Sequence, residues 1–277
     1  YAAGSSNTTG AQNIFIGDRA GSESVGTTGT NNGGIGAFAL SSTTSGTENF
    51  AYGDQALRYN TTGNYNVAIG GYALKTSTAA NYNTAIGHAA LTVNTSGNNN
   101  VAVGSVSLYR NTTGIYNVAV GVSALQENEG GNYNTAVGYQ AGYATTSSRL
   151  TAIGYQAARY NSSGYNLVSV GYRALYVNST GYSNTAVGSG TMGNTTEGIE
   201  NTAVGDSALG NNILGNYNTA MGVSALKSNY SSYNTAVGKT AGYLQQTGDF
   251  NTYVGHETGY TNVSGTSNTA MGGAALF

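Results

Sequence analysis

A five-residue phrase recurs sixteen times along this chain and constrains its fold more than any other feature. The phrase runs Asn, Thr or Val, Ala, a β-branched aliphatic residue and Gly, as in Asn83-Thr84-Ala85-Ile86-Gly87. From Gly17 to Gly272 the closing glycines lie 17 residues apart, with a few spacings of 16 and one of 19. A short fixed period is typical of a solenoid, whose units bury their apolar faces only by stacking on their neighbours.

The composition of one repeat favours strands over helices. With the closing Gly as position 0, β-branched residues occupy 13 of the 16 positions −1, and runs of three or four strand formers are too short for a helical period. Polar turns such as Asn60-Thr61-Thr62-Gly63 follow Ala at +3 and Leu at +4. We predict an all-β, parallel β-solenoid (β-roll or β-helix) of about sixteen rungs of ~17 residues, with two short strands and two turns per rung.

The periodicity predicts a single β-solenoid repeat domain over residues 1–277. Identical residues then stack into columns, including Asn at 14 of the 16 positions −4, where amides bond along the axis. At a rung spacing of ~4.8 Å, sixteen rungs predict a rod roughly 75 Å long.

The composition excludes several classes of partner. Only 7% of the residues are charged, the net charge is −2, and the nine Lys and Arg are scattered singly. This distribution lacks the basic patch that nucleic acids or anionic membranes attract, so we expect no nucleic-acid partner. The chain has no run of ~18 apolar residues, so we expect no membrane insertion.

The period-2 alternation of a strand leaves two arrangements of the core open. Positions −2 and −1 point to opposite faces, and the same argument applied to +3 and +4 separates Ala from Leu. The sequence favours Val, Ile and Leu inside with an Ala stripe outside, and the alternative is a narrow Ala core. Both leave an apolar stripe on the surface, which predicts self-association as a homopolymer or homotrimer.

The two ends of the sequence stand in nearly matching phase of the repeat. Tyr1, Ala2 and Ala3 match positions +2 to +4, and Leu276 and Phe277 match +4 and +5. We therefore predict head-to-tail stacking through these five residues, and the alternative is a segment of a longer repeat protein.

Residues suited to catalysis or metal binding are dispersed. His88 and His256 lie ten rungs apart, and of the acidic residues only Glu127 and Glu129 are close, in a turn. A pair of catalytic carboxylates must face each other across a few ångströms. We expect no enzyme, no catalytic or metal-binding residue and no cofactor.

Tyrosine is the most informative surface residue, with 23 copies. Stacking between adjacent rungs is the favoured role, and recognition of carbohydrate or a cell surface is the alternative. The tyrosines that recur just before the Asn of the phrase are Tyr65, Tyr82, Tyr116, Tyr133, Tyr217 and Tyr233.

Nine Asn-x-Ser/Thr sequons lie mostly in the same turn, which we expect to be exposed. The favoured interpretation is that Asn-Thr-Thr-Gly is simply a good turn, and the alternative is a column of N-linked glycans. The sequons begin at Asn7, Asn60, Asn94, Asn111, Asn161, Asn178, Asn194, Asn229 and Asn262. A third reading of the regular Thr and Asn arrays is a flat face that binds ice.

The Asn-x-Ala-Val/Ile-Gly phrase resembles the head repeats of trimeric autotransporter adhesins. The longer unit Asn134-Thr135-Ala136-Val137-Gly138-Tyr139-Gln140-Ala141 is similar to repeats of phage tail-fibre-like surface proteins. This resemblance covers the whole chain and implies an extracellular or cell-surface protein, or a virion fibre. Together with the repeat, it leads us to expect an extracellular structural fibre subunit or the shaft of an adhesin or tail fibre. The alternative is a module that binds carbohydrate or a host surface.

Overall fold

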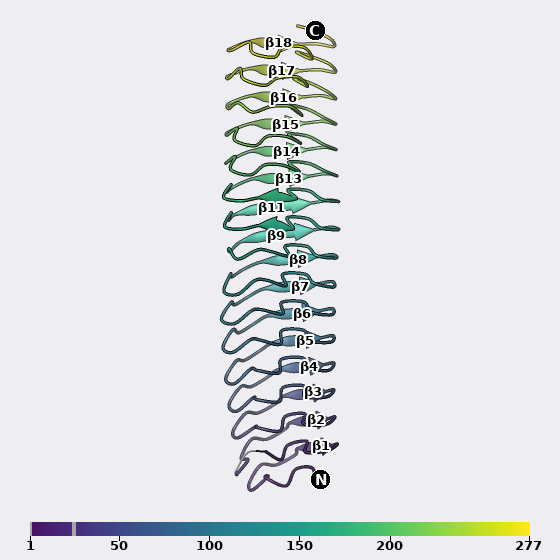
Figure 1. Ribbon diagram of the computed structural model, residues 1–277, viewed down its shortest axis with the longest axis vertical. Coiled ribbons are helices and arrows are strands. Elements are labelled where there is room, and N and C mark those ends of the chain that lie inside the picture. The colour runs from purple at the N-terminus through teal and green to yellow at the C-terminus, as the bar shows by residue number, and fades with distance from the viewer. Residues whose placement is uncertain (1, 24–25) are drawn as a thin grey trace. The chain divides into compact units, whose positions relative to one another are not determined.

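The computed structural model describes residues 2–23 and 26–277. Every element in the described part is a β-strand, and the chain forms two compact units, Tyr1–Val137 and Gly138–Phe277. Within each unit parallel strands stack one above the next, purple to teal in the first and teal to yellow in the second (Figure 1). The predicted all-β parallel solenoid is confirmed. The prediction of one domain over residues 1–277 stays a prediction.

The first unit contains one three-residue strand per rung, at positions −3 to −1 of each phrase. Equivalent residues pair in register, as Thr84 with Val101 and Ala85 with Ala102. The strands are β1 (Ile14–Ile16), β2 (Gly33–Ile35), β3 (Phe50–Tyr52), β4 (Val67–Ile69), β5 (Thr84–Ile86), β6 (Val101–Val103), β7 (Val118–Val120) and β8 (Thr135–Val137).

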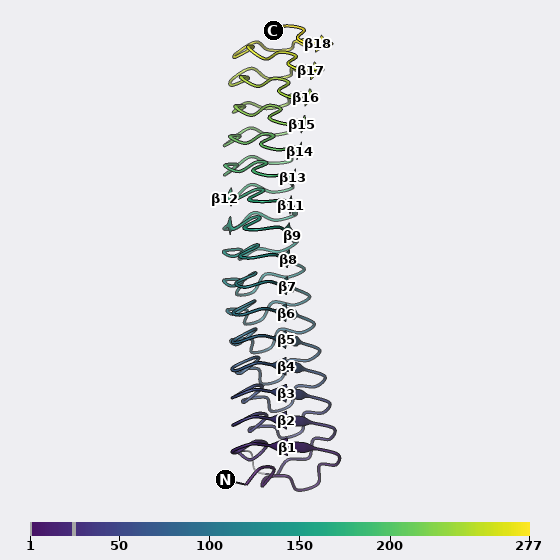
Figure 2. The same ribbon diagram turned by 90° about the vertical axis from the view of Figure 1, so that its right-hand side faces the viewer.

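The second unit continues the same strand position. Its main strands are β9 (Leu150–Ile153), β11 (Leu167–Val170), β13 (Thr185–Val187), β14 (Thr202–Val204), β15 (Thr219–Met221), β16 (Thr235–Val237), β17 (Thr252–Val254) and β18 (Thr269–Met271). Two further strands, β10 (Tyr160–Asn161) and β12 (Val177–Asn178), form a separate parallel pair. Figure 2 shows β12 on the side of its rung opposite β11.

The predicted second strand of each rung is therefore wrong for most of the described rungs. Its place is taken by a turn segment in which alternate residues, at +2 and +4, have positive φ, as at Tyr72 (62°) and Leu74 (49°). Leu74 N–H donates to Ala90 O of the next rung, whereas Lys75 N–H closes a turn onto Tyr72 O. This alternation satisfies the backbone without a regular strand.

The interior is lined by Ala at −2 and by both Ala and Leu at +3 and +4. Ala136 is fully buried, whereas its neighbour Val137 is 37% exposed. The favoured arrangement, with Val and Ile inside, is therefore wrong at −1, and the Ala alternative is correct there. The predicted separation of +3 from +4 onto opposite faces is also wrong, because Ala73 and Leu74 are both buried in a turn rather than a strand.

The sizes of the side chains on the two walls explain this choice of face. The sheet supplies small Ala, and the opposite wall supplies Leu to fill the space between them. Where Tyr253 replaces the Ala of β17, the +4 residues of its own and the preceding rung are Gly259 and Gly242. A Cβ on Gly242 would lie 2.8 Å from the Tyr253 ring. A large residue on one wall is thus matched by small ones on the other.

The closing glycines form a column that the backbone requires. Gly87 has φ of 135°, and a Cβ there would lie 2.6 Å from the carbonyl carbon of Gly104. Only glycine combines this φ with so close an approach of the next rung.

The predicted Asn column at −4 is confirmed and is buried. In a typical rung, Asn100 N–H donates to Asn83 Oδ1 at 3.0 Å, and Asn100 Nδ2 donates to Gly114 O at 2.8 Å. The column thus joins each strand start to the rung on either side. Leu150 and Leu167 interrupt it in the second unit, where β9 and β11 are four residues long and Leu167 N–H donates to Arg149 O instead.

Candidate functional site

The sequon asparagines occupy a second interior column rather than an exposed turn. Asn60, Asn94, Asn111, Asn161, Asn178 and Asn229 are fully buried, so the predicted exposure is wrong for these six. Asn111 Nδ2 donates to Gly114 O at 3.1 Å and to Asn94 Oδ1 at 2.9 Å, which uses the nitrogen that a glycan would occupy. A glycan at these six positions would be incompatible with the rung as it is folded.

The other three sequons differ in their surroundings. Asn7 and Asn194 are exposed, and in the rung of Asn194 the interior position is filled by Thr195 instead. Asn262 is half-buried, and its Nδ2 donates to the hydroxyl of Tyr253 at 2.6 Å. Glycosylation of Asn7 and Asn194 stays a prediction.

The recurring tyrosines stack on one another within each unit. Tyr65 and Tyr82 have ring centroids 4.8 Å apart and ring planes 3° apart, and Tyr116 and Tyr133 are 5.4 Å and 5° apart. In the second unit Tyr217, Tyr233 and Phe250 form one continuous stack. The six predicted tyrosines remain exposed at their edges, while one or both faces of each ring lie against a neighbouring ring. This geometry supports packing between rungs as a role of these residues, because each ring has at least one face against a neighbouring ring.

One of these tyrosines carries a perturbed pKa. The charge of Glu200 is the largest of the influences that raise the pKa of Tyr217, followed by burial and the neighbouring tyrosines Tyr233 and Tyr182. In the interior, burial raises the pKa of Tyr253 to about 12, partly offset by the hydrogen bond from Asn262. Tyr253 therefore serves as a neutral hydrogen-bonding group.

In each unit an aliphatic stripe at position −1 follows the outer face of the strands formed by each phrase. Ile86, Val137, Val204 and Val237 are each more than one-third exposed, and Met221 is 46% exposed. Beside it at −3 the second unit carries six consecutive threonines: Thr185, Thr202, Thr219, Thr235, Thr252 and Thr269. The predicted surface stripe exists, but Val, Ile and Met form it rather than Ala.

The predicted assembly ends are exposed where they are described. Tyr1 lies outside the described residues, and Ala2 and Ala3 are exposed. Leu276 and Phe277 are 50% and 65% exposed, and the Phe277 ring stacks on Tyr260 with centroids 5.6 Å apart.

The two neighbouring carboxylates that the sequence singled out, Glu127 and Glu129, pair with Arg110. Arg110 Nε lies 3.0 Å from Glu127 Oε2, and Arg110 Nη1 lies 3.8 Å from Glu129 Oε1. Among residues 2–23 and 26–277, no three His, Asp or Glu side chains lie close enough together to hold a metal ion. The same residues include no helical segment with the length and apolar character needed to span a bilayer.

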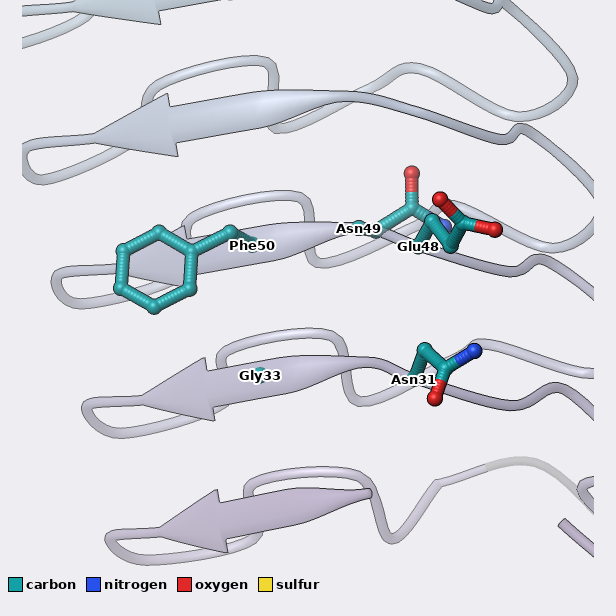
Figure 3. Close-up of a pocket in the computed structure, with 5 residues that line it drawn as sticks. All are labelled: Asn31, Gly33, Glu48, Asn49 and Phe50. Atoms are coloured by element: carbon teal, nitrogen blue, oxygen red, sulfur yellow. The ribbon is translucent and has the colours of Figure 1, made fainter. Parts of the chain in front are cut away.

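A notch in the outer face of the first unit was missed by the sequence analysis. Gly33 leaves a gap in the −3 column, and the Phe50 ring of the next rung extends along the face beside it (Figure 3). Asn31 and Glu48 project at the strand starts, and the notch has a volume of about 420 Å³. Its amide and carboxylate could accept hydrogen bonds from a hydroxylated ligand. The signal in the sequence is the glycine in a column otherwise filled by side chains.

Comparison with known proteins adds no relative. No family model, curated protein or solved structure matches this chain.

Proposed function

We propose that this chain is an extracellular structural fibre subunit that assembles with its own copies by stacking of β-solenoid rungs. The shaft of a surface adhesin or tail fibre is the same proposal in a longer protein. The observation that carries it is the column architecture: buried Asn columns, a Gly column and backbone bonds join each rung to its neighbours. These bonds run along the stacking direction, so each rung is stabilised by the rungs next to it.

Apolar columns, as well as these bonds, stabilise the stacking of rungs. Leu226 at +4 is fully buried. Burying one such Leu side chain stabilises by about 1.5–3 kcal/mol.

The aliphatic stripe supports lateral association as a second contact. Columns of half-exposed Val, Ile and Met on a flat sheet form the kind of continuous apolar surface that marks an interaction site. The extracellular location rests on the resemblance to adhesin and tail-fibre repeats.

Negative-stain electron microscopy of the purified chain over a range of concentrations tests the proposal. We expect filaments that lengthen as the concentration of the chain is raised. A variant with a Pro- and Lys-rich rung after Phe277 should give short particles, because those residues block strand edges. The control carries a copy of residues 261–277 after Phe277, which continues the repeat in phase, and should still assemble. A native chain that stays monomeric at high concentration would refute self-assembly.

A further inference from the structure

Two glycines in the second unit occupy positions where the backbone does not require glycine. At +5, fourteen of the sixteen rungs carry a side chain, as at Thr92, Gln126 and Lys227, and the exceptions are Gly193 and Gly210. Neither glycine has a positive φ. A Cβ on Gly193 would come no closer than 3.2 Å to its surroundings, whereas one on the closing Gly205 would lie 2.5 Å from Gly222 O. The two adjacent glycines therefore open a gap in a column that the fold can fill.

This gap is a trough of about 270 Å³ with a defined lining. Tyr176 stands at one end, its ring held by a hydrogen bond from Arg159 Nη1 to its hydroxyl at 3.2 Å. The next residue of the column is Gly193, so no +5 side chain covers the Tyr176 ring on that side. By contrast, Tyr243 and Tyr260 of the same column stack on each other. The trough thus ends in an aromatic wall that has room beside it.

Amides line the middle of the trough. Asn194 Nδ2 donates to Asn211 Oδ1 at 3.2 Å, which leaves Asn194 Oδ1 as an acceptor and Asn211 Nδ2 as a donor for a ligand. The hydroxyl of Ser207 also lines the space. Alternating donors and acceptors beside an aromatic ring suit a sugar, which presents hydroxyls on its edge and C–H groups on its face.

The charged residues of the lining are both basic. The Arg173 guanidinium lies over one face of the Tyr176 ring, with its carbon 5.1 Å from the ring centroid, and Arg173 Nε donates to Gln156 Oε1 at 3.0 Å. Lys227 follows Gly210 in the column and also lines the trough.

A Cβ on Gly210 would lie 3.8 Å from Lys227 Cγ, so the lysine stem borders the gap. Arg173 and Lys227 belong to rungs three steps apart, a separation of roughly 14 Å at the usual rung spacing. Among the described residues no Asp or Glu lines the trough, and Asp206 Oδ1 next to it accepts a hydrogen bond from the Ser207 hydroxyl at 3.0 Å.

We propose that this trough binds an acidic oligosaccharide, with a sugar ring against Tyr176, hydroxyls on the two amides and carboxylates beside Arg173 and Lys227. The trough lies on the turn side of the rungs, away from the aliphatic stripe and from the first and last rungs. This proposal therefore does not depend on the proposed fibre function. Its occupant must be both hydroxylated and anionic, because the trough offers neutral hydrogen-bonding groups as well as positive charge.

Calorimetric titration of the full chain with a galacturonic acid tetramer tests this proposal. The fully methyl-esterified tetramer is the matched probe without charge, and tripolyphosphate is the matched anion without sugar. We expect measurable binding of the acidic tetramer, at least tenfold weaker binding of both other probes, and weakening as salt is raised. Absence of binding by the acidic tetramer, or equal binding of tripolyphosphate, would overturn the proposal.

Two sets of variants locate the site. The double variant Gly193→Thr and Gly210→Gln fills the trough with residues found at +5 in other rungs, and we expect at least a tenfold loss of affinity. Lys227→Gln should weaken binding several-fold, whereas Lys75→Gln removes the charge from the same column position in the first unit and should leave it unchanged. Both lysines occupy position +5 and lie over a tyrosine ring, Lys227 at 5.7 Å from Tyr243 of the next rung and Lys75 at 5.1 Å from Tyr72 of its own rung. Equal effects of the two lysine variants, or full affinity in the filled variant, would refute the assignment.

Discussion

The buried Asn column predicts a specific non-additivity between neighbouring rungs. Asn83 accepts the backbone N–H of Asn100 on Oδ1 at 3.0 Å and donates from Nδ2 to Gly97 O at 2.9 Å. Asn83→Leu removes that acceptor and leaves the buried N–H of Asn100 without it. An unsatisfied buried donor costs about 1–3 kcal/mol, and each lost net hydrogen bond about 1 kcal/mol more. We expect the single variant to lower the free energy of unfolding by roughly 2–4 kcal/mol.

The second change in the same column should cost much less than the first. Asn100→Leu alone orphans the N–H of Asn117, which in the native chain donates to Asn100 Oδ1 at 2.9 Å. In the double variant the backbone N–H of residue 100 can donate to the carbonyl of Tyr82, as Leu167 donates to Arg149 at 3.1 Å above Leu150. The two single variants together leave two buried backbone N–H groups without an acceptor, whereas the double variant leaves one. The double variant should be more stable than additivity predicts by about 1–3 kcal/mol.

Urea unfolding and native-state hydrogen exchange measure this coupling together. Exchange is needed because repeat arrays unfold in parts, and a single unfolding transition is then not a safe measure. Protection of amide 100 should fall in Asn83→Leu and return in the double variant, while amide 117 loses protection. Thr84→Val, a replacement that matches Val67 and Val101 in the −3 column, is the control and should change stability by less than ~0.5 kcal/mol. Additive costs, or a protected amide 117 in the double variant, would refute the reasoning.

Three further predictions follow from the core. Ala85→Asp should unfold its rung, because an unpaired carboxylate would enter the closed interior, whereas Ile86→Asp on the outer face should remain folded by circular dichroism. Because the pKa of Tyr253 is raised to about 12, the folded chain keeps a proton that the unfolded chain loses above pH ~10. The free energy of unfolding should not depend on this group below that pH and should fall by roughly 2–3 kcal/mol between about pH 10 and 12. In urea titrations at alkaline pH, Tyr253→Phe should remove this part of the loss. At neutral pH Tyr253→Phe should cost about 1–3 kcal/mol, since Gln245 and Asn262 lose a buried partner; an unchanged urea midpoint would contradict it.

The repeat made most of the fold predictable from the sequence. The period and the β-branched residues at −1 located the strands, and the recurrent Asn at −4 located the buried column. The face that turns inward was not predictable from alternation alone, because a period of two fixes which residues share a face but not which face is covered. Which face is buried depends on the size of the side chains on the opposite wall of the rung. One signal was present in the sequence: Phe15 and Tyr253, large residues at −2, are each followed six residues later by glycine at +4.

The turn chemistry was the harder part. Leu74 with φ of 49° and Tyr82 with φ of 57° adopt a conformation that bulky residues rarely take, so propensity argued for a strand where the chain makes alternating turns. Hydrogen bonds between rungs impose this conformation. The same context buries Asn60 and its equivalents, which by composition belonged to a surface turn. Non-local stacking therefore overrode local preference at the residues where the sequence-based predictions failed.

Interruptions of a column carry the most information in such a fold, because the column itself reports only packing. Two leucines at −4 replace a side-chain ladder by a backbone bond, and the two rungs that hold them are the ones that carry the extra strand pair β10 and β12. Two glycines at +5 remove side chains without any demand from the backbone and leave a lined trough between Tyr176 and Lys227. The leucines at −4 change the hydrogen bonds that join neighbouring rungs, whereas the glycines at +5 change only the surface. A departure that the backbone does not explain is accordingly the place to look for a ligand in this chain.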